Sequence, residues 1–144
     1  MINNDTIQLL KECDSGTKMA VSSLDEILGE IQDSGLKQLL SESKEHHETL
    51  GNELHAMLLD CQSEGKDPSP MAKGMSWMKT NMKMGMEHND STAASIITDG
   101  CNMGIKSLYK YLNQYDAANE PSRDICKRLI SIENTLCEDL RAYL

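Results

Sequence analysis

A histidine at the centre of a helical apolar stripe is the residue best placed to do chemistry. The stripe repeats in steps of 4 and 3, the spacing of the inward face of a bundle helix, and consists of Leu36, Leu40, Ser43, His47, Leu50, Leu54, Met57 and Cys61. We therefore expect His47 inside the fold, where an imidazole can bind a metal ion. The favoured interpretation is nevertheless a core histidine that donates to Ser43, one turn earlier, or to a backbone carbonyl across the hairpin, and a metal ligand is the alternative.

The residues around this histidine do not complete a di-iron site. Such sites in bundles use Glu-x-x-His on two helices, with all ligands pointing inward. Lys44 stands three residues before His47, and Leu136 stands three residues after Glu133. Glu133 falls near the edge of its own stripe. No nucleophile motif, phosphate loop or paired buried carboxylates are evident either, so the sequence favours a protein that is not an enzyme.

A run of soft donors forms the second candidate site, at Met82, Met84, Met86 and His88. Thioethers suit Cu(I). Upstream, however, Met71, Met75, Met78 and Met82 follow a helical spacing, and methionine commonly fills irregular apolar contacts. The favoured interpretation is a helix packed on the bundle, with a metal site or a partner-binding groove as alternatives. We expect no resident cofactor. A bound metal ion is the alternative.

Two glycines inside a predicted helix form a third candidate. Gly100 and Gly104 cost about 1 kcal/mol each relative to alanine in a helix interior. Close approach of a neighbour such as Ile132 would offset this cost. A ligand pocket lined by Ser43, Gly100 and Gly104 is the functional alternative.

Composition narrows the class of protein. The chain has 144 residues and a formal net charge of −9, which fits one domain and argues against nucleic acid or anionic membranes as partners. No run of 18 apolar residues occurs, and the five cysteines form no C-x-x-C pair. We expect a cytoplasmic protein with buried, reduced cysteines. Tyr109, Tyr111 and Tyr115 could cover a homodimer face.

Apolar periodicity predicts an all-α antiparallel four-helix bundle. Helices are expected over residues 4–32, 35–61, 91–114 and 120–143, with a long crossover carrying a short helix over 70–84. Gly35 is expected in a left-handed turn position, and His47 should face Ala20 across the first hairpin. A five-helix array is the alternative. The remaining inward stripes are Leu10, Cys13, Thr17, Ala20, Leu24, Ile27 and Ile31; Ala93, Ile97, Gly100, Gly104, Leu108 and Tyr111; and Ile125, Leu129, Ile132, Leu136, Leu140 and Tyr143.

The pattern resembles the ferritin-like superfamily, in particular its small bacterial members of uncharacterised function. Leu39–Leu59, LLSESKEHHETLGNELHAMLL, is similar to their second helix, and Asp99–Tyr115, DGCNMGIKSLYKYLNQY, to their third. The resemblance implies a four-helix bundle, often with a metal pair at its middle. Because the di-iron motif is broken, we predict a non-catalytic structural or protein-interaction module that binds a protein partner or itself. The alternative is a metal or small-ligand binding protein that uses His47 or the Met82–His88 run.

Overall fold

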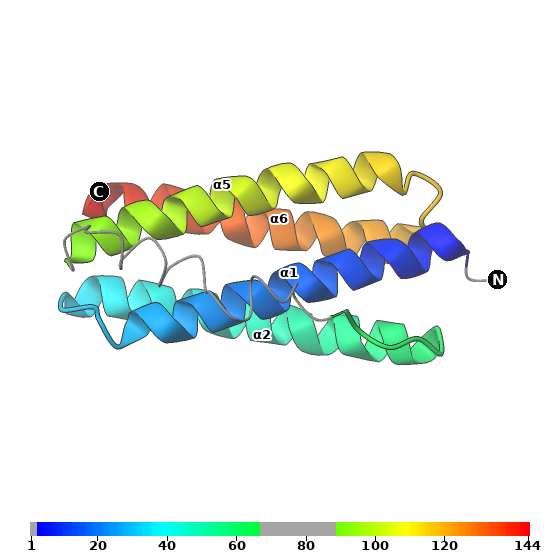
Figure 1. Cartoon of the computed structure of the whole chain (residues 1–144), viewed down its shortest axis with the longest axis horizontal. Helices are drawn as coiled ribbons and strands as arrows, with labels where there is room; N and C mark the ends of the chain where they lie inside the picture. The colour runs from blue at the N-terminus through cyan, green and yellow to red at the C-terminus, as the bar shows by residue number, and fades with distance from the viewer. Residues whose placement is uncertain (1–2, 67–88) are drawn as a thin grey trace.

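The computed structural model describes residues 3–66 and 89–144, and these residues form a four-helix bundle (Figure 1). The helices are α1 (Asn4–Leu28), α2 (Ser34–Asp60), α5 (Asp90–Gln114) and α6 (Glu120–Leu140), followed by a short 3-10 helix, η1 (Arg141–Tyr143). No strand occurs in these two ranges. The all-α bundle is therefore confirmed. The helix expected over 70–84 lies outside the described residues.

The four helices form two hairpins joined by one long crossover. Asp90, at the start of α5, accepts hydrogen bonds from the backbone N–H groups of Gln32 at 2.9 Å and Asp33 at 2.8 Å. Helix α5 therefore begins beside the α1–α2 turn, at the opposite end of the bundle from the end of α2 (Figure 1). As a result α2 and α5 run in the same direction, which a hairpin connection could not achieve.

Each of the four described α-helices begins at a side-chain cap. Asn3, Asp33, Asn89 and Asn119 each accept a hydrogen bond from a backbone N–H in the first turn of the helix that follows, which satisfies a donor that the helix itself leaves unpaired. The cap at Asp33 corrects two expectations. Helix α1 ends at Leu28 rather than at residue 32, and Gly35 lies in the first turn of α2 rather than in a left-handed turn.

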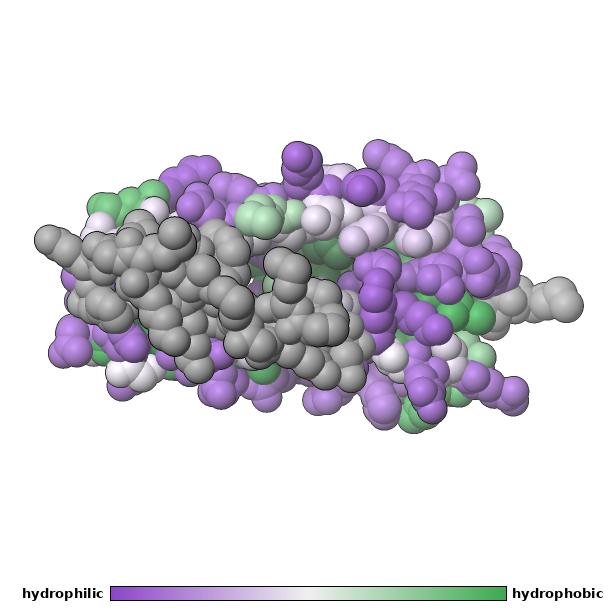
Figure 2. Space-filling view, viewed as in Figure 1, coloured by the Kyte–Doolittle hydropathy of each residue, from purple (hydrophilic) through white to green (hydrophobic). Residues whose placement is uncertain are grey.

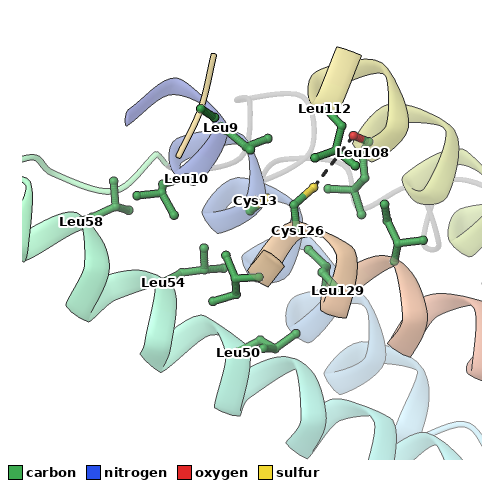
Figure 3. Packing of buried hydrophobic residues seen from close by; sticks show 13 residues of the cluster. Leu9, Leu10, Cys13, Leu50, Leu54, Leu58, Leu108, Leu112, Cys126 and Leu129 are labelled. Carbon is green, nitrogen blue, oxygen red and sulfur yellow. Dashed lines mark hydrogen bonds between the residues drawn. The ribbon is translucent and has the colours of Figure 1, made fainter. Parts of the chain in front are cut away.

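The core consists of two apolar clusters, one at each end of the bundle. The cluster at the α1–α2 turn includes Leu24, Leu40, Ile97 and Leu136. The opposite cluster is rich in leucine (Figure 3), with Leu9, Leu50, Leu54, Leu108 and Leu129 among its members. Along every helix a short interval separates the residues of one cluster from those of the other. Most of the buried polar side chains of the described residues lie in that interval, whereas Thr6 and Ser122 are buried at the starts of α1 and α6.

The predicted stripes are correct in part. On α2, the stripe is buried from Leu36 to Leu54, but Leu58 then takes the inward position expected for Met57 and Cys61. The reason is that an α-helix of 3.6 residues per turn drifts away from a strict 3.5-residue repeat. On α5, Cys101 and Leu112 are buried, whereas Gly100 and Tyr111 are only partly buried, and on α6 Glu133 is buried in preference to Ile132. None of the described helices is apolar over a length that could cross a membrane.

Candidate functional site

A polar layer crosses the middle of the bundle between the two apolar clusters. It comprises Thr17 on α1, Ser43 and His47 on α2, Gly104 on α5 and Glu133 on α6. The three ligand-type side chains are all buried: His47 is 1% exposed, Ser43 6% and Glu133 8%. Polar groups in such a setting cost free energy unless they find partners. The Thr17 hydroxyl has one, because it donates to the carbonyl of Cys13 at 2.8 Å.

His47 has one ring nitrogen in use and one without a partner. Its Nδ1 lies 2.8 Å from the backbone carbonyl oxygen of Ser43. A carbonyl only accepts, so Nδ1 carries the hydrogen and donates it. The hydrogen-bonded histidine that the sequence favoured is therefore present, with the backbone carbonyl of Ser43 as its acceptor. Nε2 then faces Oε1 of Glu133 at 3.8 Å, which is too long for a hydrogen bond.

Glu133 lies directly against the glycine that the sequence singled out. A Cβ added at Gly104 would lie 2.5 Å from Oε2 of Glu133 and 3.1 Å from its Cδ and Oε1. The close neighbour of Gly104 is thus this carboxylate and not Ile132. The missing side chain on α5 makes the space that the carboxylate of α6 occupies.

Three polar atoms of this layer have no hydrogen-bond partner among the described residues: Ser43 Oγ, His47 Nε2 and Glu133 Oε2. Leaving one such atom unsatisfied costs about 1 to 3 kcal/mol, so these three atoms are the ones in the layer that a bound group could satisfy. Two ligands of one tetrahedral zinc ion lie about 3.3 Å apart, and two acceptors bridged by one water lie about 4.4 Å apart. The observed 3.8 Å between Nε2 and Oε1 falls between these values.

Buried thiols border the polar layer, and the Glu133 carboxylate of the layer contributes to raising the pKa of two of them, Cys13 and Cys101. Burial raises the pKa of the Cys101 thiol, and the neighbouring Cys137 thiol and Glu133 carboxylate raise it further. Contact with Cys126, together with burial, raises the pKa of Cys13. All five cysteines are free, and three of them, Cys13, Cys101 and Cys126, are buried. In the described ranges, no three His, Cys, Asp or Glu side chains converge as a metal cluster.

The structure brings together three of the predicted site residues. Ser43, His47 and Gly104 share the polar layer, while Gly100 lies one turn earlier on α5 and is partly buried. Met82, Met84, Met86 and His88 lie outside the described residues. Sequence reasoning gave Glu133 no role, although Leu129, Glu133, Leu136 and Leu140 follow steps of 4, 3 and 4. Ile132 was preferred for that stripe because it is apolar.

The comparisons with known proteins show a similarity of fold alone. The chain is similar to a crystal structure of a conserved hypothetical protein, rv2844, from Mycobacterium tuberculosis, with a TM-score of 0.75. The two are 10% identical in sequence, and the similarity covers 100% of both chains. No protein-family model and no curated protein matches the sequence.

Proposed function

We propose that this protein binds one divalent transition-metal ion between His47 and Glu133. The observation that carries the proposal is the pair of facing atoms, Nε2 of His47 and Oε1 of Glu133, which are 3.8 Å apart and not hydrogen-bonded. A metal-binding histidine typically donates its other ring N–H to a carbonyl or carboxylate, which fixes the tautomer. The hydrogen bond from His47 to the Ser43 carbonyl supplies that second contact.

The donor set defines the class of ion. Imidazole nitrogen together with carboxylate oxygen suits borderline ions such as Zn²⁺, Co²⁺ and Fe²⁺. With two protein donors at the described site, water would complete the coordination, as at open metal sites. Gly104 supports this arrangement because it leaves room for the carboxylate. The role we propose is binding, without a catalytic step.

Titration of the metal-free protein with Co²⁺ under anaerobic conditions tests the proposal, because Co²⁺ reports its ligands through its visible absorption spectrum. We expect saturation at one ion per chain. His47→Ala and Glu133→Gln should each abolish the spectrum. Elemental analysis of protein purified without chelators should give the same stoichiometry for the native metal.

Matched controls come from the same helices. His55 on α2 and Glu138 on α6 are exposed, so His55→Ala and Glu138→Gln should leave the spectrum unchanged. Met84→Leu separates binding at the methionine run from binding at His47. A wild-type protein that shows no saturable Co²⁺ spectrum would overturn the proposal, as would equal loss in the control variants.

A structural or protein-interaction module is the second candidate. It is favoured by large apolar side chains at the surface: Leu59 is 60% exposed, Met103 59% and Tyr109 52%. Among the coloured residues in Figure 2, however, hydrophilic ones predominate and the apolar patches are small and separated, which is ordinary for a monomer. Light scattering across a concentration series tests self-association. A homodimer that Tyr109→Ser dissociates would support this candidate.

Membership of the ferritin-like superfamily is part of the same proposal. The single long crossover and the polar layer at mid-bundle support it, since ferritin-like folds have one such connection and bind metal inside the bundle. A cytoplasmic location is likewise proposed, and the free cysteines are consistent with a reducing compartment. Mass spectrometry of freshly isolated protein, with thiols trapped at lysis, should find all five cysteines reduced.

A further inference from the structure

Four of the five cysteines form two pairs whose thiols contact each other across neighbouring helices. Cys13 on α1 contacts Cys126 on α6. In the same way, Cys101 on α5 contacts Cys137 on α6. The first is a sealed pair inside the leucine-rich cluster (Figure 3), because both of its side chains are 0% exposed. The second is an accessible pair, because Cys101 is 7% exposed and Cys137 is only partly buried. A small reagent can therefore reach the second pair from solvent and not the first.

The Cys137 thiol lies on the turn of α5 that carries Cys101. Its Sγ is 3.9 Å from the carbonyl oxygen of Thr98 and 3.7 Å from Oδ1 of Asn102. Cys101 is three residues after Thr98 and directly before Asn102, so these two contacts hold the sulfur from α6 beside its partner thiol. Cys101 belongs to the apolar cluster at the α1–α2 turn, and Cys137 packs against that cluster. Two packed helices, rather than loops, thus keep the sulfurs together.

We propose that Cys101 and Cys137 form a redox-active dithiol that a small peroxide converts into a disulfide. Cys137 loses its proton and its sulfur attacks one oxygen of hydrogen peroxide, which gives a sulfenic acid and hydroxide. The Cys101 sulfur then attacks the sulfenic sulfur, so that the S–S bond forms and the second oxygen leaves as water. The proton from Cys137 converts the hydroxide into water. Overall, two thiols lose two electrons and two protons, and one peroxide becomes two waters. A dithiol reverses the change by thiol–disulfide exchange.

Access assigns the order of the two sulfurs. Cys137 meets the peroxide first because its side chain is partly exposed, and Cys101, which is buried behind it, completes the bond. Burial raises the pKa of the Cys137 thiol, and the thiolate is the reactive species. We therefore expect oxidation that is slower than that of a peroxidase cysteine but that goes to completion. The reaction needs no metal ion and no side chain of the proposed metal site.

Peptide mapping of the full chain after treatment with hydrogen peroxide tests the proposal. Metal-free Cys61→Ala protein, which lacks the cysteine outside both pairs, is treated with peroxide in the presence of a chelator. It is then denatured, alkylated and digested with trypsin. Lys106 and Arg128 lie between the two cysteines of the accessible pair, so their disulfide joins two tryptic peptides that dithiothreitol separates. We expect this linked peptide from most chains, with the loss of two alkylatable thiols per chain, while the sealed pair stays reduced.

Single substitutions separate the two roles, with circular dichroism to show that each variant folds. In Cys101→Ala, the sulfenic acid on Cys137 has no thiol to react with, so dimedone should label Cys137. In Cys137→Ala, Cys101 should be neither labelled nor linked. Cys13→Ala is the matched control and should leave the yield of linked peptide unchanged, as should His47→Ala, whether or not a metal binds. The proposal is overturned if the accessible pair stays reduced, if the sealed pair oxidises equally, or if the linkage forms only between chains.

Discussion

The contact between Gly104 and Glu133 makes a sharp prediction for the variant Gly104→Ala. In the wild-type protein, a Cβ at this position would lie 2.5 Å from Oε2 of Glu133, whereas ordinary van der Waals contact begins at 3.4 Å. The carboxylate must therefore retreat by about 0.9 Å, the difference of these two distances. Glu133 would then leave its present position opposite His47.

Two opposing terms set the magnitude. Replacing glycine by alanine in a helix interior stabilises by about 1 kcal/mol, and overpacking a core costs about 1 to 3 kcal/mol. We expect Gly104→Ala to be net destabilising by up to about 2 kcal/mol, which is a fall in Tm of several degrees for a chain of this size. We also expect weaker Co²⁺ binding, because the carboxylate oxygen has moved.

Gly16→Ala is the matched control. Gly16 is likewise inside a helix, α1, and a Cβ there would meet nothing within 4 Å. This variant should be stabilised by about 0.4 to 1 kcal/mol. Urea unfolding followed by circular dichroism compares the two variants. If Gly104→Ala proves as stabilising as Gly16→Ala, the carboxylate does not occupy the space at Gly104 and the described site is wrong.

A double-mutant cycle isolates the contact itself. Glu133→Ala removes the carboxylate, so the added methyl group of Gly104→Ala should then fit. We expect the second substitution to be neutral or stabilising in the Glu133→Ala background, with a coupling energy of about 1 to 3 kcal/mol. Additive effects of the two substitutions would contradict the contact.

Three further predictions concern the ends and the thiols of the bundle. Asp90→Ala should destabilise by about 1 to 3 kcal/mol in urea unfolding, because it removes both hydrogen bonds to the Gln32 and Asp33 N–H groups; Asp90→Asn, which keeps one acceptor, should lose less. The folded state raises the pKa of the Cys101 thiol above its ordinary value of about 9, so above that pH unfolding releases a proton. The free energy of unfolding should therefore fall as pH rises above about 9. Cys101→Ala should reduce the slope of the free energy of unfolding against pH by about 1.4 kcal/mol per pH unit. In native alkylation followed by mass spectrometry, the partly buried Cys61 should react before the fully buried Cys13 and Cys126; equal rates would contradict their burial.

The fold could be predicted from the sequence because local signals agree along most of the chain. Asn89 and Asn119 cap helices within one residue of the expected starts, and the stripe from Leu36 to Leu54 is buried as its spacing indicates. The end of α1 could not be placed in the same way. Ile31 continues the apolar pattern and is buried at 5% exposure, yet it lies beyond the helix because Asp33 starts the next one.

Of the two facing side chains of the candidate site, His47 could be predicted from the sequence and Glu133 could not. His47 interrupts a row of leucines, so its inward position follows from spacing alone. Glu133 has an isoleucine beside it at position 132, and hydrophobic patterning assigns the inward place to the apolar residue. Which of the two turns inward depends on Gly104, because α5 leaves space for the carboxylate at that position. That information lies in a third helix and not in the local sequence.

The polar layer can be explained by register or by binding, and its geometry separates the two. A buried ion pair is commonly no more stable than apolar side chains of similar size, and polar core groups can instead fix the alignment of helices. Alignment by polar groups requires that they bond to one another. Here Nε2 of His47 and Oε1 of Glu133 stop at 3.8 Å, and Ser43 Oγ finds no partner among the described residues. The two atoms therefore make no direct contact that would specify register, and this separation is what the proposed binding of an ion between them would use.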